Sequence, residues 1–578
     1  MDTSSTITPV TPRKKMPAEV FVKIWENRIS DTLLKTWEKW VVFDTYFGIR
    51  QATLSNVEVE GHITIKKNED PLLHLVLSNC RLPNLELENA KLRSLIIENN
   101  SATGEFSIYN SSIGDISIRS NSKTKIFRIF TNSKVGHFEI SDHSKSDDII
   151  ILESCTIKSF YIYNNSISKN IRISGNSSMG NIRIENNSTI LDFWITDYSS
   201  IGDLTISSNS TIWDLYIYNS KGTILDIRDK CKVAKIIIQH SDLHRIWVLS
   251  DSFVGYLKCQ FTLLNPVHLI LGGSVFGYID FDNSVFPEFT TMSIKSCTLN
   301  YLSLNNFCNY GTVFFSGLLP LEKWEDFARN ENGPIFLRGL PRFETFTRPT
   351  CIRFTDSDLG KMQFINCDLR QFDRFEFSNT KMLDVFAAGS QMPGENAFCL
   401  PDDEKNSLNI AEQKRLAYGQ FKKIYEARGD VAGSLPYLAY EMEAYRQQLK
   451  MEGSWKNKGE LALLWMNKIS TNYGNSWGQG LKMILISIVF CYSIFLGSIG
   501  HPIGNPFSWE DWKEAFRLYS YAPHFINPLR DADSIILVEN EKELSSFARF
   551  WDFFSRIIVA YFAYQTIQAF RKLGKSSG

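Results

Sequence analysis

Apolar residues recur every eleven positions through the middle of the chain. The first apolar position is held by Phe160, Ile171, Ile182, Phe193, Leu204 and Leu215, and the position two residues later by Ile162, Ile173, Ile184, Ile195, Ile206 and Ile217. Apolar residues at i and i+2 place both side chains on one face of a strand. Because an odd period cannot keep one face inward along a straight strand, the chain must bend once per unit. The pattern predicts a β-solenoid with two units, about 22 residues, in each coil.

A polar corner follows each strand and ends in a column of small residues. The column runs through Ser111, Ser122, Ser133, Ser144, Cys155, Ser166, Ser177, Ser188, Ser199 and Ser210, and Asn often precedes it. Asn and Ser hydrogen-bond to their own backbone in turns, which suits a corner. Cys155 and Cys231 fall in this column, so we expect them to be stacked core residues. No two of the ten cysteines have C-x-x-C spacing, so neither a zinc site nor a redox dithiol is indicated.

Strands resume after residue 347 with a shorter spacing. Phe354, Leu359, Phe364 and Leu369 are five residues apart, and Asn-Cys-Asp-Leu occupies 366–369. Here the chain resembles the pentapeptide-repeat proteins, and the resemblance implies a right-handed quadrilateral β-helix for this part. The expected fold class is an all-β solenoid (a parallel β-helix with 11-residue units and a pentapeptide-like end), followed by a helical hairpin and two transmembrane helices.

The patterning also divides the chain into segments. Near the start, apolar residues from Phe21 to Trp37 recur every four positions, which predicts an amphipathic helix that caps the solenoid or binds a partner. The expected order is an N-terminal helix and cap (1–50), β-solenoid repeats (51–318), an irregular insertion (319–347), pentapeptide-like final coils (348–400), a helical hairpin (404–452), an interfacial helix and joint (456–480), transmembrane helix 1 (481–499), an external connection with an amphipathic helix (500–549) and transmembrane helix 2 (553–572).

Two segments near the carboxyl end have the composition of membrane spans. In 481–499 the only charged residue is Lys482, and its nineteen residues reach about 28 Å, the thickness of a bilayer core. The second apolar body is 553–572. The connection 501–549 carries five Lys or Arg and eight Asp or Glu, whereas the far end is basic. The positive-inside rule therefore predicts a multi-pass protein of the inner (cytoplasmic) membrane, with the N-terminal solenoid and the C-terminus in the cytoplasm.

Several side chains suggest roles at or in the membrane. Gln565 and Gln568 share a helix face, with Thr566 beside them, and this face either lines a pore or packs against another helix. No selectivity-filter sequence is present. The residues expected at the membrane interface are Arg556, Arg571, Lys572, Trp465, Trp509 and Trp512.

The order of these segments resembles that of bacterial membrane-anchored pentapeptide-repeat proteins. The matching residues are NCDL at 366–369, YEMEAYRQQL at 440–449, TNYGNSW at 471–477 and YQTIQAFRKLGK at 564–575. The resemblance covers roughly the last 230 residues. It implies a C-terminal two-helix, ion-channel-like membrane segment and no settled activity.

Charge and motifs exclude several function classes. The chain has 62 basic and 63 acidic residues, so bulk electrostatic binding to nucleic acid is not expected. The amino end has no apolar run and does not read as a secretory signal. No catalytic, cofactor-binding or metal motif is found. We therefore expect a non-enzymatic, membrane-anchored scaffold or sensor whose partners are the lipid bilayer and an unknown protein on the solenoid face. An oligomeric ion channel or pore effector is the alternative, with a possible homo-oligomer, and a glycan-acting β-helix enzyme is a remote one.

Overall fold

The computed structural model describes residues 13–25, 31–46, 49–66, 73–261, 267–321, 349–382, 384–395, 397–400, 407–499, 513, 516–527 and 545–574. The chain forms two compact units. The first comprises Met1–Glu376 with Thr380–Cys399, and the second Phe377–Asn379 with Leu400–Gly578. Trp509 and Trp512, and nearly all of the predicted insertion 319–347, lie outside the described residues.

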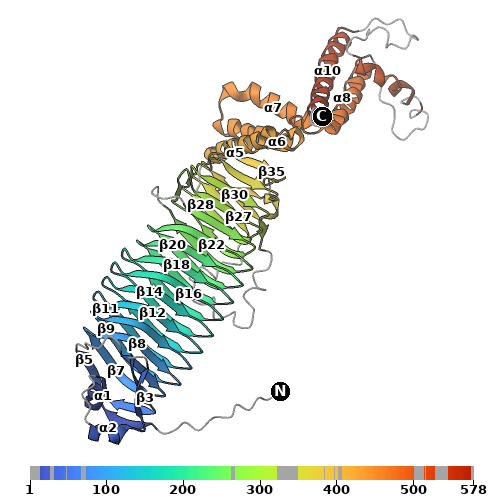
Figure 1. The fold of residues 1–578 in the computed structure, drawn as a ribbon. Helices are drawn as coiled ribbons and strands as arrows, with labels where there is room; N and C mark the ends of the chain where they lie inside the picture. The colour runs from blue at the N-terminus through green and yellow to red at the C-terminus, as the bar shows by residue number, and fades with distance from the viewer. Residues whose placement is uncertain are drawn as a thin grey trace. The chain divides into compact units, whose positions relative to one another are not determined.

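The first unit is a parallel β-solenoid of about 14 turns, whose coils stack one on the next (Figure 1). One sheet has 18 strands. They are β1 (Lys14–Pro17), β4 (Val57–Glu60), β5 (His62–Lys66), β7 (Arg81–Glu88), β9 (Ala102–Tyr109), β11 (Lys123–Phe130), β13 (Lys145–Ile151), β15 (Ile167–Ile173), β17 (Thr189–Ile195), β19 (Thr211–Tyr218), β21 (Lys232–Gln239), β23 (Phe253–Gln260), β25 (Val275–Asp280), β28 (Thr298–Asn305), β31 (Leu319–Pro320), β32 (Cys351–Thr355), β34 (Arg374–Ser378) and β36 (Phe398–Cys399).

The second sheet has 16 strands, and a small third sheet has two. The second sheet contains β2 (Val41–Tyr46), β3 (Ile49–Ser55), β6 (His74–Ser78), β8 (Lys91–Glu98), β10 (Ser112–Ile118), β12 (Lys134–Ile140), β14 (Thr156–Ile162), β16 (Ser178–Ile184), β18 (Ser200–Ile206), β20 (Lys221–Ile227), β22 (Asp242–Val248), β24 (His268–Gly272), β27 (Thr291–Lys295), β30 (Thr312–Ser316), β33 (Met362–Ile365) and β35 (Phe386–Ala388). The third pairs β26 (Val285–Phe286) with β29 (Cys308–Asn309).

The strand register confirms the predicted coil length. Ile157 pairs with Met179 in the next coil, and Ile182 pairs with Leu204. Each partner is two 11-residue units away, so alternate units belong to opposite sheets. The predicted apolar columns and the small-residue column are buried between the sheets. The two cysteines predicted in that column, Cys155 and Cys231, are also buried.

Most corners between residues 99 and 251 contain two consecutive residues in the left-handed region. Asn164 and Asn165 have φ values of 58° and 59°, and Asn186 and Asn187 have 56° and 60°. Asn tolerates this region better than most residues, which explains why it recurs at corners. The Asn165 N–H donates to the Asn186 carbonyl at 2.9 Å, and Asn186 Nδ2 donates to Asn164 Oδ1 at 3.1 Å. Corners of successive coils are therefore joined by their own hydrogen-bond ladder.

The amino end caps the solenoid with strands as well as helices. Strand β1 pairs in parallel with β4, and β2 pairs antiparallel with β3. The segment predicted as one helix contains α1 (Ala18–Trp25) and α2 (Asp31–Trp37). The Lys14 ammonium lies 4.4 Å from the ring centroid of Trp37 and 3.9 Å from that of Trp40. At the other end, Phe354, Leu359, Phe364 and Leu369 of the five-residue pattern are all buried, and the short helix η2 (Leu369–Gln371) follows.

The second unit is helical. Helices α5 (Ser407–Ala427) and α6 (Val431–Glu452) form a hairpin that turns at Gly429. The helices that follow, among those whose bounds the described residues give, are η3 (Trp455–Asn457), α7 (Lys458–Thr471), α8 (Trp477–Ser498), η4 (Ala522–Ile526) and α10 (Ser546–Gly574). Phe525 of η4 packs against Tyr492 and Phe495 of α8.

Among the described helices, α8 is long and apolar enough to cross a membrane, but α10 does not meet that measure. The prediction of two such helices is therefore correct for one of them. Helix α10 is continuous over 29 residues. It begins earlier than predicted and includes Arg549, Asp552 and Arg556, which lower its mean hydropathy. The apolar run in the sequence starts only at 553, because Arg549 and Asp552 lie just before it.

Candidate functional site

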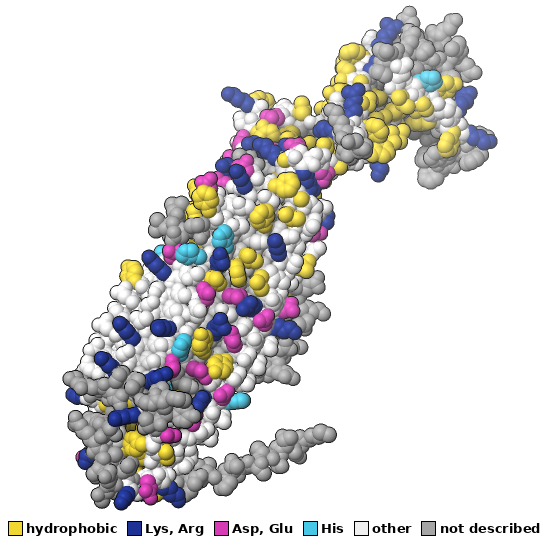
Figure 2. Space-filling view, in the orientation of Figure 1, with side chains coloured by type: hydrophobic (Ala, Val, Ile, Leu, Met, Phe, Trp, Pro, Cys, Tyr) yellow, Lys and Arg dark blue, Asp and Glu magenta, His cyan; other side chains and the backbone are white. Residues whose placement is uncertain are grey.

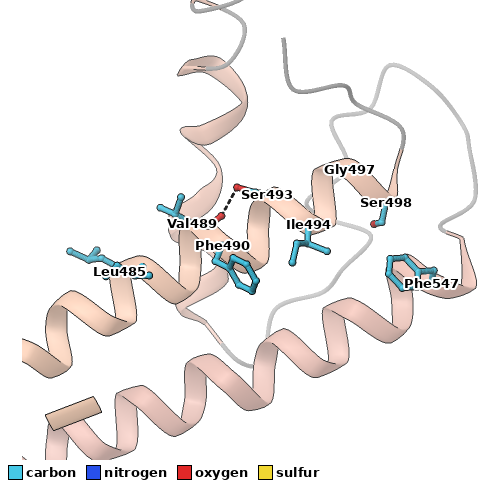
Figure 3. Close-up of a pocket in the computed structure, with 9 residues that line it drawn as sticks. Leu485, Val489, Phe490, Ser493, Ile494, Gly497, Ser498 and Phe547 are labelled. Carbon is cyan, nitrogen blue, oxygen red and sulfur yellow. Dashed lines mark hydrogen bonds between the residues drawn. The ribbon is translucent and has the colours of Figure 1, made fainter. Parts of the chain in front are cut away.

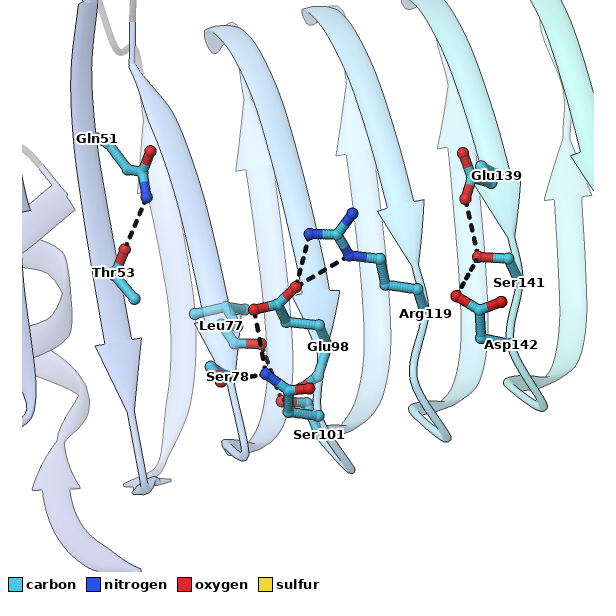
Figure 4. Close-up of polar contacts among 11 residues, drawn as sticks. Gln51, Thr53, Leu77, Ser78, Glu98, Ser101, Arg119, Glu139, Ser141 and Asp142 are labelled. Carbon is cyan, nitrogen blue, oxygen red and sulfur yellow. Dashed lines mark hydrogen bonds and ion pairs between the residues drawn. The ribbon is translucent and has the colours of Figure 1, made fainter. Parts of the chain in front are cut away.

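The outer face of the solenoid is a surface of paired polar groups. In Figure 4, Arg119 donates two hydrogen bonds to Glu98 Oε2 in the preceding coil, at 2.9 and 2.7 Å. Three acidic residues close together in the sequence, Asp142, Asp147 and Asp148, are used in the same way. Their contacts are Asn164 Nδ2 to Asp142 (2.9 Å), Lys169 Nζ to Asp147 (2.8 Å) and Asn170 Nδ2 to Asp148 (2.6 Å). These carboxylates join successive coils, and among the described residues no group of three metal-ligating side chains occurs.

Aromatic side chains on the outer face also form ladders. Tyr278 stacks on Tyr301 with ring centroids 4.3 Å apart, and Trp194 stacks on Tyr216 at 4.0 Å. Stacked rings cover each other's faces, which are the surfaces that sugar rings use. Figure 2 shows acidic and basic side chains interspersed along this unit. The glycan-acting alternative gains no support from this arrangement.

A denser polar cluster lies where α6, α7 and the joint before α8 meet. Glu443 of α6 accepts two hydrogen bonds from Arg446, the shorter at 2.6 Å. The same carboxylate also accepts from Lys468 Nζ of α7 and from the hydroxyl of Tyr473 in the joint, both at 3.1 Å from Oε2. We call these four residues the Glu443 cluster. It connects two of the segments, 440–449 and 471–477, that resembled the pentapeptide-repeat membrane proteins.

Glu443 is held ionised by this cluster. Burial acts to raise the pKa of Glu443, but hydrogen bonds from Arg446 and Lys468, together with their positive charges, outweigh burial and lower the pKa to about 2. Burial, followed by the nearby Glu443 carboxylate, raises the pKa of Tyr473, so its hydroxyl remains a donor at neutral pH. The cluster is therefore a charge-assisted connection between helices.

The Glu443 cluster predicts an acid-sensitive helical unit. Because the folded-state pKa is lowered, the stabilisation is present above the unfolded value near 4.5 and is lost as the pH falls towards about 2. With solvent screening, we expect about 1 kcal/mol to be lost. Protection of α6 and α7 against hydrogen exchange, measured relative to the intrinsic exchange rate at each pH, should fall over this pH window in the native protein. The Glu443→Gln variant should show a smaller pH-dependent change, and an identical pH profile would contradict this role.

The joint after α7 places α8 by a left-handed turn. Asn472, Tyr473 and Gly474 all have positive φ values. A Cβ atom at Gly474 would lie 3.1 Å from Lys572 Nζ, so the end of α10 passes close to this turn. Ser476 caps α8 by accepting from the Gln479 N–H at 3.2 Å. The TNYGNSW sequence thus forms a compact connection between α7 and α8.

Helices α8 and α10 approach closely near the start of α8. A Cβ atom at Gly480 would lie 2.4 Å from Thr566 Oγ1. Nearby, the rings of Trp477 and Phe570 meet edge to face, with centroids 6.5 Å apart. Further along, the Trp551 indole donates to the Cys491 carbonyl at 2.9 Å. Glycine at 480 therefore permits a helix contact that a larger residue would obstruct.

The structure places the predicted site residues at different positions. Thr566 lies at the α8–α10 contact and donates to the Phe562 carbonyl at 2.7 Å, whereas Gln565 and Gln568 are half-buried on α10. Of the predicted interface residues, Lys572 is half-buried beside the joint, and Arg571 is exposed. Trp465 is also exposed, on α7. The contact with Gly480 favours the packing role for Thr566.

Arg556 has a partner that sequence reasoning missed. It forms an ion pair with Asp552 one turn earlier, with two nitrogens on Oδ2 at 2.8 and 2.5 Å. Asp552 is 3% exposed and Ser555 is fully buried. The i, i+4 spacing was visible, but Asp552 lay outside the predicted helix. Ionisable groups buried in apolar helices are paired, because burying an isolated charge among apolar side chains costs free energy.

No protein-family model matches the chain, and no curated protein or solved structure matches it. The resemblance to pentapeptide-repeat membrane proteins therefore rests on the residues quoted above.

Proposed function

We propose that this protein is a membrane-anchored scaffold or sensor, held in the bilayer by α8 and α10, whose solenoid binds a protein partner. The termini and the solenoid would lie in the cytoplasm, as the distribution of basic residues suggests. One observation carries the proposal: the packed α8–α10 pair displays large apolar side chains on its outside. They are Leu481, Leu485, Ile486, Val489 and Phe490 on α8, and Phe547, Phe550, Phe553, Phe554, Ile557, Tyr564, Ile567 and Phe570 on α10.

Mean hydropathy understates the apolar character of the outward face of α10. Its polar residues Asp552 and Ser555 are buried, and Thr566 faces Gly480. These residues lower the mean hydropathy of the helix without making its outward face polar. Figure 2 shows hydrophobic side chains across the surface of this part of the chain. A soluble protein rarely exposes so large an apolar patch, whereas lipid chains would cover it.

The α8 surface also contains an open apolar groove of about 1040 Å³. Figure 3 shows Leu485, Phe490 and Ile494 on one wall and Phe547 of α10 on the other. Ser493 lines the groove, but its hydroxyl donates a hydrogen bond to the Val489 carbonyl at 2.7 Å. The groove therefore suits acyl chains better than water.

Membrane extraction tests the anchor. We expect the full-length protein to stay with membranes in alkaline carbonate. The double variant Val489→Asp/Ile557→Asp should be released, because placing each carboxylate against lipid costs about 2–3 kcal/mol or more. Tyr310→Asp, a change at an exposed solenoid residue, is the matched control and should remain bound. Release of the native protein would contradict the anchor.

The channel alternative is favoured by Gln565 and Gln568, which leave a half-buried polar face on α10. A pore built this way would require several copies of the chain. Ion flux through liposomes that contain the full-length protein distinguishes the two functions. Flux that falls in the Gln565→Leu/Gln568→Leu variant supports a channel, whereas no flux with verified insertion supports an anchored scaffold.

A further inference from the structure

Helix α7 turns its polar side chains towards the protein. Three of them, from the start to the end of the helix, make contacts with other helices. These contacts are Tyr445 Oη to Glu460 (2.8 Å), Tyr561 Oη to Asn467 Oδ1 (2.9 Å) and Lys468 Nζ to Glu443 (3.1 Å). Leu464, on the same side, is buried with residues of α6 and the joint. This side is the one that a water-facing helix would use for its apolar residues.

The opposite side of α7 is apolar and uncovered by the described residues. Leu463 is 53% exposed, Trp465 55% and Met466 38%. Ala462 and Gly459 share this face and are also exposed. At 100° per residue these five positions form one continuous arc, so the polarity of α7 is inverted relative to a helix at a water-facing surface.

The charge around α7 indicates what covers this face. From 450 to 482 the chain has five lysines and two glutamates, and one of the glutamates, Glu460, is already bonded to Tyr445. Lys456 and Lys458 stand at the start of the helix, where Lys458 Nζ lies 3.3 Å from the ring centroid of the exposed Trp455. Apolar, aromatic and basic residues together are the composition of a helix that lies on an anionic membrane.

The position of α7 agrees with an anionic membrane as the surface that covers its apolar face. It connects through a short joint to α8, and Figure 1 shows it leaving the α8–α10 pair at its base. If α8 crosses the bilayer, the carboxyl end of α7 at Thr471 therefore lies at the level of the lipid headgroups. Lys482, Arg571 and Trp477 at the same end of the pair are exposed.

We propose that α7 lies in the plane of the membrane surface and binds anionic phospholipid, with Leu463, Trp465 and Met466 among the upper acyl chains and Lys456 and Lys458 at the headgroup phosphates. The inference rests on the proposed anchor, because α8 brings α7 to the bilayer. It adds a lipid preference that α8 and α10 alone would not produce. Each lysine should favour the anionic surface about fivefold.

Environment-sensitive labels on the full-length protein test this inference. An NBD label is placed at Met466→Cys, Gln447→Cys or Ile486→Cys, and vesicles contain phosphatidylcholine with or without phosphatidylglycerol, plus lipids that carry a nitroxide at shallow or deep positions. Since the described native cysteines are buried or half-buried, the unsubstituted protein supplies the labelling background. Gln447 is an exposed residue on α6 and serves as the water-facing control.

The label at Met466 should be quenched by the shallow nitroxide, more strongly in anionic than in neutral vesicles. Lys456→Glu/Lys458→Glu should remove that difference. The inference is overturned if Met466 resembles Gln447 while Ile486 is quenched by the deep nitroxide. It is also overturned if the Met466 label is shielded from water without being quenched, because another protein surface would then cover the face. An unquenched Ile486 label would instead contradict the anchor itself.

Discussion

Replacing Phe138 by alanine is expected to destabilise the solenoid by about 3–5 kcal/mol. Phe138 is fully buried, with its ring centroid 4.7 Å from that of Phe127 and 5.2 Å from that of Phe160. The cavity cannot close easily, because backbone ladders fix the distance between β10, β12 and β14. The neighbouring side chains therefore cannot move in to replace the contacts that the Phe138 ring makes.

The effect of Phe138→Ala should also be local. Each coil contacts only its neighbours, so its loss weakens the adjacent coils more than distant ones. Hydrogen exchange should increase in β11, β12 and β14 and much less in β27 and β30. Lys134→Ala removes an exposed side chain from the same strand and should change stability by less than about 0.5 kcal/mol. Uniform exchange along the solenoid would show that its coils do not respond separately.

The solenoid could be predicted because its physical causes repeat. The period of eleven fixes the inward face of the strands in the regular coils, and the Asn-rich corners match the left-handed residues of the turns. Strand β1 lacks any such repetition: Lys14–Pro17 is four residues long and pairs with β4. A single short segment of this kind has no local pattern that distinguishes it from a loop.

The junction of the helical unit could be predicted only in part. The apolar run of α8 was visible, as was the possibility that α7 lies at the interface. The Gly480–Thr566 contact joins residues 86 positions apart, and one sequence contains no signal for such a pair. Asp552 was missed because a buried charge lowers the hydropathy that defines a membrane segment. The inverted polarity of α7 depends on the contact of Lys468 with Glu443 on another helix, which the sequence of α7 alone does not contain.

Gly480→Ala is expected to destabilise the packed α8–α10 pair by about 1–3 kcal/mol, the usual cost of overpacking. The new Cβ would lie 2.4 Å from Thr566 Oγ1, closer than real contacts allow, and 3.0 Å from Thr471 Cγ2, tighter than most real contacts. The helices must separate or shift, and the end of α10 would move from the joint. Thermal unfolding of the detergent-solubilised full-length protein, followed by helical circular dichroism, measures the loss.

Two further variants separate this clash from a general effect of replacing glycine. Gly478 lies two residues earlier in α8, and none of the described atoms comes within 4 Å of its Cβ position. Gly478→Ala should therefore be neutral or stabilising by up to about 1 kcal/mol, since alanine favours helix. Adding Thr566→Ala to Gly480→Ala removes the nearest obstructing atom and should restore part of the stability. If Gly478→Ala were as damaging as Gly480→Ala, or if Thr566→Ala restored nothing, close packing at Gly480 would not be what holds α8 against α10.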